Sequence, residues 1–507
     1  MDSRQLIETA GSGPVMGELF RLRSLFRCDR IAIQDDRRSL SYAQLNQRVN
    51  QLANVLAGGG VRPGDRIAIM SENRTEYIEV QLACAKLGAI AACQNWRQSD
   101  AELIYCINLV SPSVMFCSQR YALDVERLDL AIPKTIALGD EYEMLLRQSS
   151  DREPRSAVTP EDGVLILYTS GTTGFPKGAL ISHRAMIARA ALMFADWRLS
   201  PDEAYIAWSP QFHLSGTDLS LCTLLQGGKV RIIDGFDQRQ IGEAIASEKI
   251  NWLITVPGMI ERTMAEVRER KIVPKGIRLI GSMPDLLQPQ LIAELTTTLQ
   301  SPFLNSFGAT ETGMAPASKT LIPIGHAPLN CDKEQSSFCD IRLVDDDDQE
   351  VPLGHVGELA LRSLTLFSGY WNAEKTNLLD FRQGWFHMGD MFRRNVDGTL
   401  SFVDRKKYMI KSGGENIYPA EIEKVLLASD RIAEVAVVRQ LDKKWGEVPV
   451  AFVVRRDPTL TEEHVIALCR SAIAGYKVPK AVRFVNSTDI PRSETGKVKR
   501  HDLEKMV

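Results

Sequence analysis

Residues Tyr168–Gly178 read Tyr-Thr-Ser-Gly-Thr-Thr-Gly-Phe-Pro-Lys-Gly. The four apolar residues before them, Val164 to Leu167, are typical of a short buried strand. Glycines let the following backbone turn tightly, and successive N–H groups in such a turn can surround one anion. The stretch therefore predicts a cradle for a polyphosphate, formed by Thr169, Ser170, Gly171, Thr172, Thr173, Gly174 and Lys177.

Two other interpretations of this loop fit less well. A Walker loop has Ser or Thr directly after its lysine and enters a helix at once. Here Pro176 precedes Lys177 and Gly178 follows it. A flexible surface loop would share the composition, but it would not need this particular order of residues.

Composition and charge exclude several classes of protein. A chain of 507 residues is too long for one core, so we expect two or more domains. The net charge of -3 does not indicate a nucleic-acid partner, and no apolar run approaches the length of about 18 residues that predicts a membrane span. The nine scattered cysteines suit a reducing compartment. Without a signal peptide or a peroxisomal terminus, we predict a cytoplasmic protein.

Strand and helix patterns alternate along most of the chain, which predicts an α/β fold with parallel strands covered by helices. From about Cys339 the pattern changes to short strands with turns, which predicts a small β-barrel-like piece. We interpret the acidic run Asp345–Asp348 as a solvated hairpin turn. The expected elements are helices at 43–56, 77–87, 241–248 and 257–267 and strands at 66–70, 89–92, 164–167, 230–233, 252–256, 278–281, 340–344, 357–361 and 399–402.

The last hundred residues predict a separate small α+β unit, with strands at 435–438, 450–454 and 481–485 and a helix at 464–474. From Asp404 onward the chain has 20 Lys and Arg against 15 Asp and Glu, a net charge of +5, whereas the residues before it have 41 against 49, a net charge of -8. A basic unit above an acidic body suits a ligand with several phosphates. We therefore expect a large body, 1–403, and a mobile C-terminal lid, 404–507.

The order Thr-Ser-Gly-Thr-Thr-Gly-x-Pro-Lys-Gly resembles the phosphate loop of the adenylate-forming enzymes. This family includes acyl-CoA synthetases, peptide-synthetase adenylation domains and firefly luciferase. The resemblance extends over nearly the full length of the chain and rests on several separate motifs. It implies a body of two sheet-and-helix layers with a small barrel, and it places the ATP and acyl sites in that body.

Two further motifs of the body resemble the same family. Phe307–Thr312 is similar to its aromatic-Gly-x-Thr-Glu element, which implies that Glu311 binds Mg²⁺ and that Thr310 faces the α-phosphate. A carboxylate oxygen is the ligand that this hard cation prefers. Gly384–Asp390 is similar to Trp-x-x-Thr-Gly-Asp, which implies that Asp390 accepts hydrogen bonds from both ribose hydroxyls, although this chain has Met388 in place of the usual Thr.

The most specific match is Asp404–Glu423 in the predicted lid. It implies that Arg405 contacts the nucleotide and that Lys407 is the hinge, although Tyr408 replaces the acid that often follows a hinge. It also implies a tunnel for the thiol at Gly413 and Gly414 and roles in thioester formation for Lys411 and Asn416. Pro491–Val498 resembles the loop of the catalytic lysine, so Lys497 would offset negative charge when a carboxylate attacks the α-phosphate.

The acyl pocket is indicated by Pro210–Gly216 and Gly281–Pro284, which resemble the corresponding family segments. Members that activate amino acids have Asp where this chain has His213, so an amino-acid substrate is disfavoured. Methionines make an adaptable apolar wall. We expect a hydrophobic or ring-bearing carboxylic acid in a pocket formed by His213, Ser215, Gly216, Ser282, Met283, Gly308 and Met314.

The resemblance implies an AMP-forming acyl-CoA synthetase. ATP and a carboxylic acid would give an acyl adenylate and pyrophosphate, and coenzyme A would then displace AMP while the lid rotates about Lys407. A ligase that loads a carrier protein stays open as an alternative, as does a homodimer. A non-enzymatic nucleotide sensor is a third possibility, but the intact Lys177, Glu311, Asp390, Arg405 and Lys497 argue against it.

Overall fold

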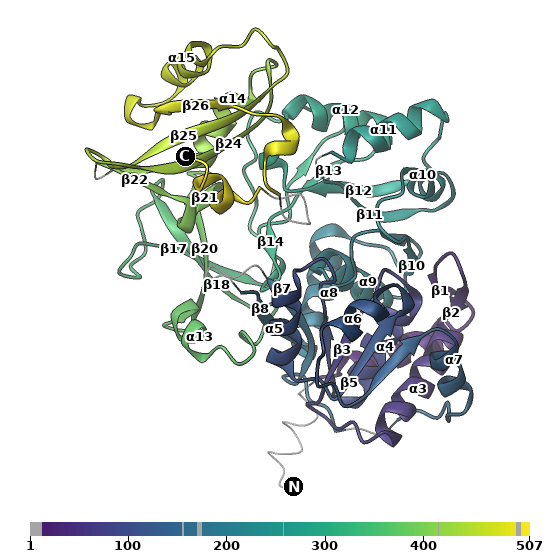
Figure 1. Cartoon of the computed structure of the whole chain (residues 1–507). Coiled ribbons are helices and arrows are strands. Elements are labelled where there is room, and N and C mark those ends of the chain that lie inside the picture. The colour runs from purple at the N-terminus through teal and green to yellow at the C-terminus, as the bar shows by residue number, and fades with distance from the viewer. Residues whose placement is uncertain (1–12, 155–156, 170–174, 257, 414, 493–497) are drawn as a thin grey trace.

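The computed structural model of the chain describes residues 13–154, 157–169, 175–256, 258–413, 415–492 and 498–507 (Figure 1). Its first sheet has six strands, five of them parallel, and the last strand pairs antiparallel with its neighbour. This confirms the α/β fold. In spatial order the strands are β6 (Thr135–Leu138), β5 (Val114–Ser118), β3 (Arg66–Met70), β4 (Ile90–Cys93), β7 (Gly163–Thr169) and β8 (Lys177–Ser182).

The second sheet has eight strands and is also parallel in its interior, with one antiparallel strand at each edge. In spatial order the strands are β16 (Leu321–Ile322), β13 (Phe303–Asn305), β12 (Ile277–Ser282), β11 (Ile250–Ile254), β9 (Ala204–Ala207), β10 (Lys229–Ile232), β1 (Ile31–Gln34) and β2 (Ser39–Ser41).

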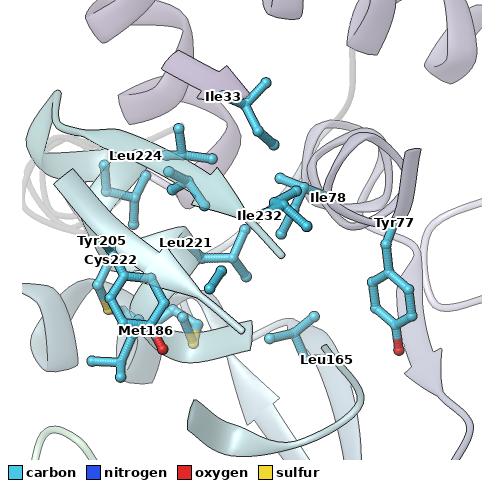
Figure 2. Packing of buried hydrophobic residues seen from close by; sticks show 14 of the residues in the cluster. Ile33, Tyr77, Ile78, Leu165, Met186, Tyr205, Leu221, Cys222, Leu224 and Ile232 are labelled. Carbon is cyan, nitrogen blue, oxygen red and sulfur yellow. The ribbon is translucent and has the colours of Figure 1, made fainter. Parts of the chain in front are cut away.

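One apolar cluster joins the two sheets, and helices α4 and α9 are buried within it (Figure 2). Every residue of α4 is buried. Its polar Gln81 therefore needs a partner inside the core, and it donates to Thr217 at 2.9 Å. The helices of this body are α2 (Met16–Phe26), α3 (Tyr42–Gly58), α4 (Thr75–Leu87), α5 (Asp100–Val110), α6 (Ala122–Arg127), α7 (Asp140–Arg147), α8 (His183–Trp197), α9 (Leu214–Gln226), α10 (Gln238–Ser247), α11 (Ile260–Glu269), α12 (Pro289–Leu299) and α13 (Glu374–Asp380).

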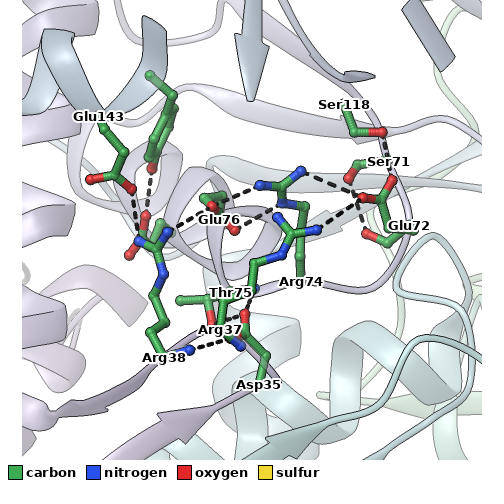
Figure 3. A network of polar contacts seen from close by, with 12 residues as sticks. Asp35, Arg37, Arg38, Ser71, Glu72, Arg74, Thr75, Glu76, Ser118 and Glu143 are labelled. Atoms are coloured by element: carbon green, nitrogen blue, oxygen red, sulfur yellow. Dashed lines mark hydrogen bonds and ion pairs between the residues drawn. The ribbon is translucent and has the colours of Figure 1, made fainter. Parts of the chain in front are cut away.

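Buried ion pairs surround the N-terminal end of α4 (Figure 3). Arg74 binds Glu76 at 2.8 Å, and Arg38 bridges Glu76 and Glu143 at 3.2 and 2.7 Å. Hydrogen bonds from Arg48 and Arg38 lower the pKa of Glu143 to about 2. Each charge in this network has a partner of opposite sign, which is the condition for burying charges without a large loss of stability.

The short strands predicted after Cys339 form a five-stranded antiparallel sheet. Its strands are β17 (Cys339–Val344), β18 (Val356–Ser363), β20 (Trp385–Arg394), β19 (Phe381–Arg382) and β21 (Leu400–Arg405). A two-stranded ribbon, β14 (Gly308–Ala309) and β15 (Gly313–Pro316), precedes it.

From Ile410 onward the chain forms its own sheet around two apolar clusters that contain no residue of the preceding chain. The strands are β22 (Ile410–Ser412), β23 (Glu415–Ile417), β24 (Ile432–Asp442), β25 (Gly446–Arg455) and β26 (Ala481–Phe484), and the helices are α14 (Pro419–Leu427), α15 (Glu462–Ala472) and α16 (Arg500–Glu504). In the described part of the chain, no helix has both the length and the apolar character needed to cross a membrane.

Candidate active site

The predicted phosphate loop connects two paired strands. Thr169 ends β7, Lys177 begins β8, and the two residues are register partners. The sequence did not reveal β8, because its residues run directly into the helical pattern of α8. Ser170, Gly171, Thr172, Thr173 and Gly174 lie outside the described residues, so their predicted contacts with phosphate stay predictions.

Lys177 is held beside an aromatic ring from a distant part of the chain. Its Nζ lies 4.4 Å from the centre of the Tyr370 ring and 3.5 Å from Oδ2 of Asp380. The backbone explains this arrangement, because the outer edge of β8 pairs with residues 368–371. Ser368 donates to the carbonyl of Leu180 at 2.7 Å, and Trp371 donates to the carbonyl of Gly178 at 2.8 Å.

Glu311 lies at the same tyrosine. The Tyr370 hydroxyl donates to Oε1 of Glu311 at 2.8 Å, and the backbone N–H of Phe367 donates to the Glu311 carbonyl at 2.8 Å. Burial raises the pKa of Tyr370 strongly, and the negative charge of Glu311 raises it further. Tyr370 therefore stays protonated and connects the lysine of the phosphate loop with the carboxylate predicted to bind Mg²⁺.

A buried arginine on α8 supports the Thr310–Glu311 loop. Arg189 on α8 forms an ion pair with Asp218 on α9 at 2.6 Å, and both side chains are almost fully buried. Its guanidinium also donates to the carbonyl of Thr310 at 3.0 Å and to the carbonyl of Thr365 at 3.1 Å. The Arg189 guanidinium has three partners in all, so it can fix the loop where a nucleotide would contact Thr310.

The residues present fit a magnesium ion that is bound mainly by phosphates and water. The hydrogen bond from Tyr370 uses only Oε1 of Glu311 and leaves Oε2 outside that contact. In the described ranges, no three His, Cys, Asp or Glu side chains form a cluster that could hold a metal alone. Mg²⁺ commonly takes one or two carboxylates and completes its shell with substrate phosphates and water, so the predicted role of Glu311 would need no second acidic residue.

Asp390 and Arg405 face each other across two paired strands, β20 and β21. Nε of Arg405 lies 3.2 Å from Oδ1 of Asp390; the carboxylate is buried, whereas the guanidinium is partly exposed. Two residues predicted separately for nucleotide binding are therefore adjacent. Arg405 ends β21, and the chain leaves this sheet at Lys406.

The predicted hinge follows immediately in a short 3₁₀ turn, residues 406–408. Lys407 is exposed, with Nζ 5.0 Å from the Tyr408 ring, and Arg500 lies on that ring at 4.9 Å. Lys406 is anchored to the body, where it contacts Glu358 at 2.9 Å and Asp346 at 2.8 Å. Burial would raise the pKa of Glu358, but hydrogen bonds from His387 and Lys406 lower it to about 2. One residue of the acidic run Asp345–Asp348, Asp346, therefore forms an ion pair with Lys406 beside the predicted hinge.

The predicted thioester residues are brought together by a hairpin. Lys411 in β22 and Asn416 in β23 are register partners, and both are exposed. Between them, Gly413 has a φ of +59°, and a Cβ there would lie 2.8 Å from the Trp445 ring. The position therefore requires glycine. Gly414 and the predicted catalytic Lys497 lie outside the described residues.

The predicted acyl residues come from three places: the start of α9 (His213, Ser215 and Gly216), the end of β12 (Ser282 and Met283) and the β14–β15 ribbon (Gly308 and Met314). His213 caps α9, its Nδ1 lies 2.9 Å from Oγ of Ser215, and Oγ of Ser215 lies 2.5 Å from Oγ of Ser209. Ser282 is the last residue of β12, and its carbonyl accepts a hydrogen bond from the backbone N–H of Ser306 at 3.2 Å. Met283 packs against the apolar cluster that contains Phe307, and Met314 packs against the main core.

Two glycines of the predicted acyl pocket are required by close backbone contacts. A Cβ at Gly216 would lie 2.1 Å from the Pro210 carbonyl oxygen, and one at Gly308 would lie 2.1 Å from the Gly313 carbonyl oxygen. Both positions therefore keep their loops tight, whatever further part they have in the acyl pocket.

Sequence reasoning missed three residues that shape the site: Tyr370, Asp380 and Arg189. Tyr370 and Asp380 come close only because β8 pairs with a segment far along the chain. Arg189 had a detectable signal, since a charged residue on the buried side of an amphipathic helix needs a partner. Its partner Asp218 lies on the next helix and is equally buried.

Comparisons with known proteins agree with this arrangement. Residues 23–371 match the model of the family described as AMP-binding enzyme, and residues 421–497 match that of the AMP-binding enzyme C-terminal domain. An indoleacetate–CoA ligase from Aromatoleum aromaticum is 35% identical over 488 residues, covering 94% of this chain and 95% of the relative. A feruloyl-CoA synthase from Amycolatopsis sp. is 32% identical over 482 residues, with 94% and 95% covered.

A solved structure of o-succinylbenzoate coenzyme A synthetase from Bacillus subtilis, in complex with ATP and a magnesium ion, also matches. It superposes with a TM-score of 0.82 and 25% sequence identity, covering 96% of this chain and 98% of that one.

Proposed function

The chain belongs to the family of AMP-binding enzymes, and on this premise we propose that it is an AMP-forming acid–thiol ligase that converts a ring-bearing carboxylic acid to its CoA thioester. The observation that carries this proposal is the meeting of Lys177 and Glu311 at Tyr370. A cation and a metal-binding carboxylate held together in this way suit ATP, whose phosphates need both. Bound Mg²⁺ would offset the phosphate charge.

The division of roles follows from chemistry that this chain can supply. A carboxylate must attack the α-phosphate although both are anions, so a cation is needed, and we assign that role to Lys497. Asp390 and Arg405 would hold the ribose and nucleotide. The hairpin with Lys411, Gly413, Gly414 and Asn416 would guide the thiol of CoA. An aryl substrate is supported by the relatives named for indoleacetate and ferulate.

We further propose that the enzyme works in the cytoplasm. All nine cysteines are free thiols, with no disulfide among them, and six are buried. That pattern is typical of a compartment that keeps thiols reduced.

The test measures pyrophosphate release from ATP with a panel of aromatic and aliphatic carboxylic acids, with and without CoA. We expect release that needs an acid and Mg²⁺, together with a thioester product when CoA is added. Excess chelator should abolish turnover. If the adenylate forms but only a phosphopantetheine carrier protein accepts the acyl group, the acceptor is a carrier protein instead of CoA. If no acid stimulates release, the ligase proposal is wrong.

A further inference from the structure

A small cavity lies at the carboxyl ends of strands β9 and β11. Trp208 follows β9 and Thr255 follows β11, and both line the cavity together with Phe236 and Met259. The indole N–H of Trp208 donates to the carbonyl of Ile254 at 3.2 Å, which fixes its ring as one wall. Phe236 packs edge-on against Trp208, with ring centres 5.8 Å apart.

Thr255 places an unused hydroxyl in this apolar cavity. The residue is 4% exposed, and its Oγ1 is buried without a hydrogen-bond partner among the described residues. The other hydroxyl in the lining, that of Thr263, already donates to the carbonyl of Met259 at 2.9 Å. A buried hydroxyl without a partner costs stability, so a native site of this kind calls for a ligand or an ordered water.

One lining residue of the cavity, Thr255, is bonded to the strand that carries the predicted acyl residue Ser282. Ile254 and Gly281 are register partners on parallel strands, and the N–H of Thr255 donates to the Gly281 carbonyl at 3.2 Å. Thr255 therefore lies beside Ser282, whose Oγ is also buried without a described partner. Strand β11, which leads into Thr255, and strand β13, which leads toward Thr310, are separated by β12 alone. Two strand spacings amount to on the order of 10 Å.

The size and chemistry of the cavity define what it can hold. The free space amounts to about 10 Å³, about the room of one water molecule, and too little for a ring. None of the described lining residues is charged, so an ionised group would be buried without a partner there. A hydroxyl fits both limits, as does the N–H edge of a ring that itself stays outside the cavity, because the Thr255 hydroxyl can accept or donate one hydrogen bond.

We propose that Thr255 is a specificity-determining residue that recognises a neutral hydrogen-bonding group at the far end of the acid, opposite its carboxylate. This inference rests on the proposed ligase function and adds the substrate class. The acid is elongated and apolar in its middle, with a hydroxyl or ring N–H at its tip. An arylpropenoic acid with a para hydroxyl has these properties.

The experiment compares 4-hydroxycinnamic acid with cinnamic acid, which lacks only the hydroxyl. Thr255→Val should lower kcat/KM for the hydroxylated acid about tenfold, while leaving cinnamic acid within about twofold. Thr255→Ser should keep most of the preference. Thr263→Val is the matched control from the same cavity and should change neither acid, because its hydroxyl bonds within its own helix turn.

Thermal melting without substrate gives a second readout. Because the Thr255 hydroxyl lacks a protein partner, Thr255→Val should melt at the parent temperature or above it. A clear decrease would mean that the hydroxyl serves the fold, and equal losses for both acids would mean that it does not recognise the tip; either result overturns the inference. Turnover with other acids but with neither cinnamic acid overturns it too. If no carboxylic acid is activated, the ligase function itself fails.

Discussion

At the scale of single residues, the hydrogen bond that orients Glu311 can be distinguished from the negative charge that would bind a metal. Its Oε1 accepts from Tyr370, so the carboxylate is oriented before any ligand arrives. A preorganised group of this kind does not have to be reoriented during the reaction. A neutral amide oxygen could accept the same hydrogen bond, whereas only the carboxylate also supplies a negative charge for a metal.

Glu311→Gln tests the charge and the hydrogen bond independently, because the amide oxygen can still accept from Tyr370 but the side chain carries no charge. We expect adenylate formation to fall by about 10²–10³-fold and to need more Mg²⁺, with an unchanged melting temperature. The matched control is Asp380→Asn, an acid 3.5 Å from Lys177 that we do not assign to the metal. A Glu311→Gln enzyme with the magnesium dependence of the parent would remove Glu311 from the metal site.

At the scale of elements, the β22–β23 hairpin and the 493–497 stretch are predicted to serve different half-reactions. Lys497→Ala should slow adenylate formation by about 10²–10³-fold and spare thioester formation from supplied acyl adenylate. Gly413→Ala should do the reverse, since its Cβ would push against Trp445 at the thiol side.

Single-turnover measurements of each half-reaction check this division. Gly475→Ala is the control, because a Cβ at that glycine of the same unit meets nothing within 4 Å. Equal losses of both half-reactions in both variants would show that the lid does not alternate between two orientations.

The N-terminal helix α2 is attached to α8 through a histidine. The backbone N–H of Met16 donates to Nδ1 of His183 at 3.2 Å, and Nε2 is buried with no partner in the described structure. Burial lowers the pKa of His183 to about 4. The folded protein therefore holds neutral histidine, whereas the unfolded chain takes up a proton below its ordinary value near 6.5.

Stability should consequently fall as the pH drops from about 6.5 toward 4. For one group with this shift, the free energy of unfolding should be about 2 kcal/mol lower at pH 5 than at pH 7. Urea unfolding at the two pH values measures it. His183→Asn retains an acceptor for Met16 but does not titrate in this range, so its pH dependence should be smaller by that amount. An identical pH dependence in the variant would exclude His183 as the source.

At the scale of the whole molecule, the residues from 404 onward should behave as an independent unit. Its two apolar clusters draw only on that part of the chain, and identified contacts with the body, such as Lys406 with Glu358, are polar. We propose that this unit is the mobile lid.

A fragment spanning 404–507 should therefore fold alone. We expect a cooperative thermal transition and a near-UV circular dichroism signal, because its core is complete without the body. The full-length protein is the reference for both signals. A fragment that keeps helical signal but shows no cooperative melting would indicate that the body is needed to order this core.

The sequence predicted features that depend on local order. The strand expected at 66–70 has those bounds, and the one expected at 252–256 overlaps β11, Ile250–Ile254. Motif residues such as Thr310, Asp390 and Lys411 follow or occupy strands. What it could not predict depends on contacts between distant segments. Tyr370 gains its place from pairing with β8, and the Asp346 contact with Lys406 arises between a hairpin and the hinge. The helix expected from 257 begins at Ile260 instead, after a turn that the apolar spacing did not reveal.

The pairing of β8 with residues 368–371 also has a consequence during synthesis on the ribosome. β8 is the edge strand of its sheet, and these later residues cover its outer side. At about 5–20 residues per second, the roughly 190 residues between them take about 10–40 s to emerge. Over that interval the nascent chain presents an open strand edge of the kind that recruits other chains. Premature termination before Ser368 would therefore yield a product prone to aggregate, and chaperones that shield nascent strands would act chiefly within this window.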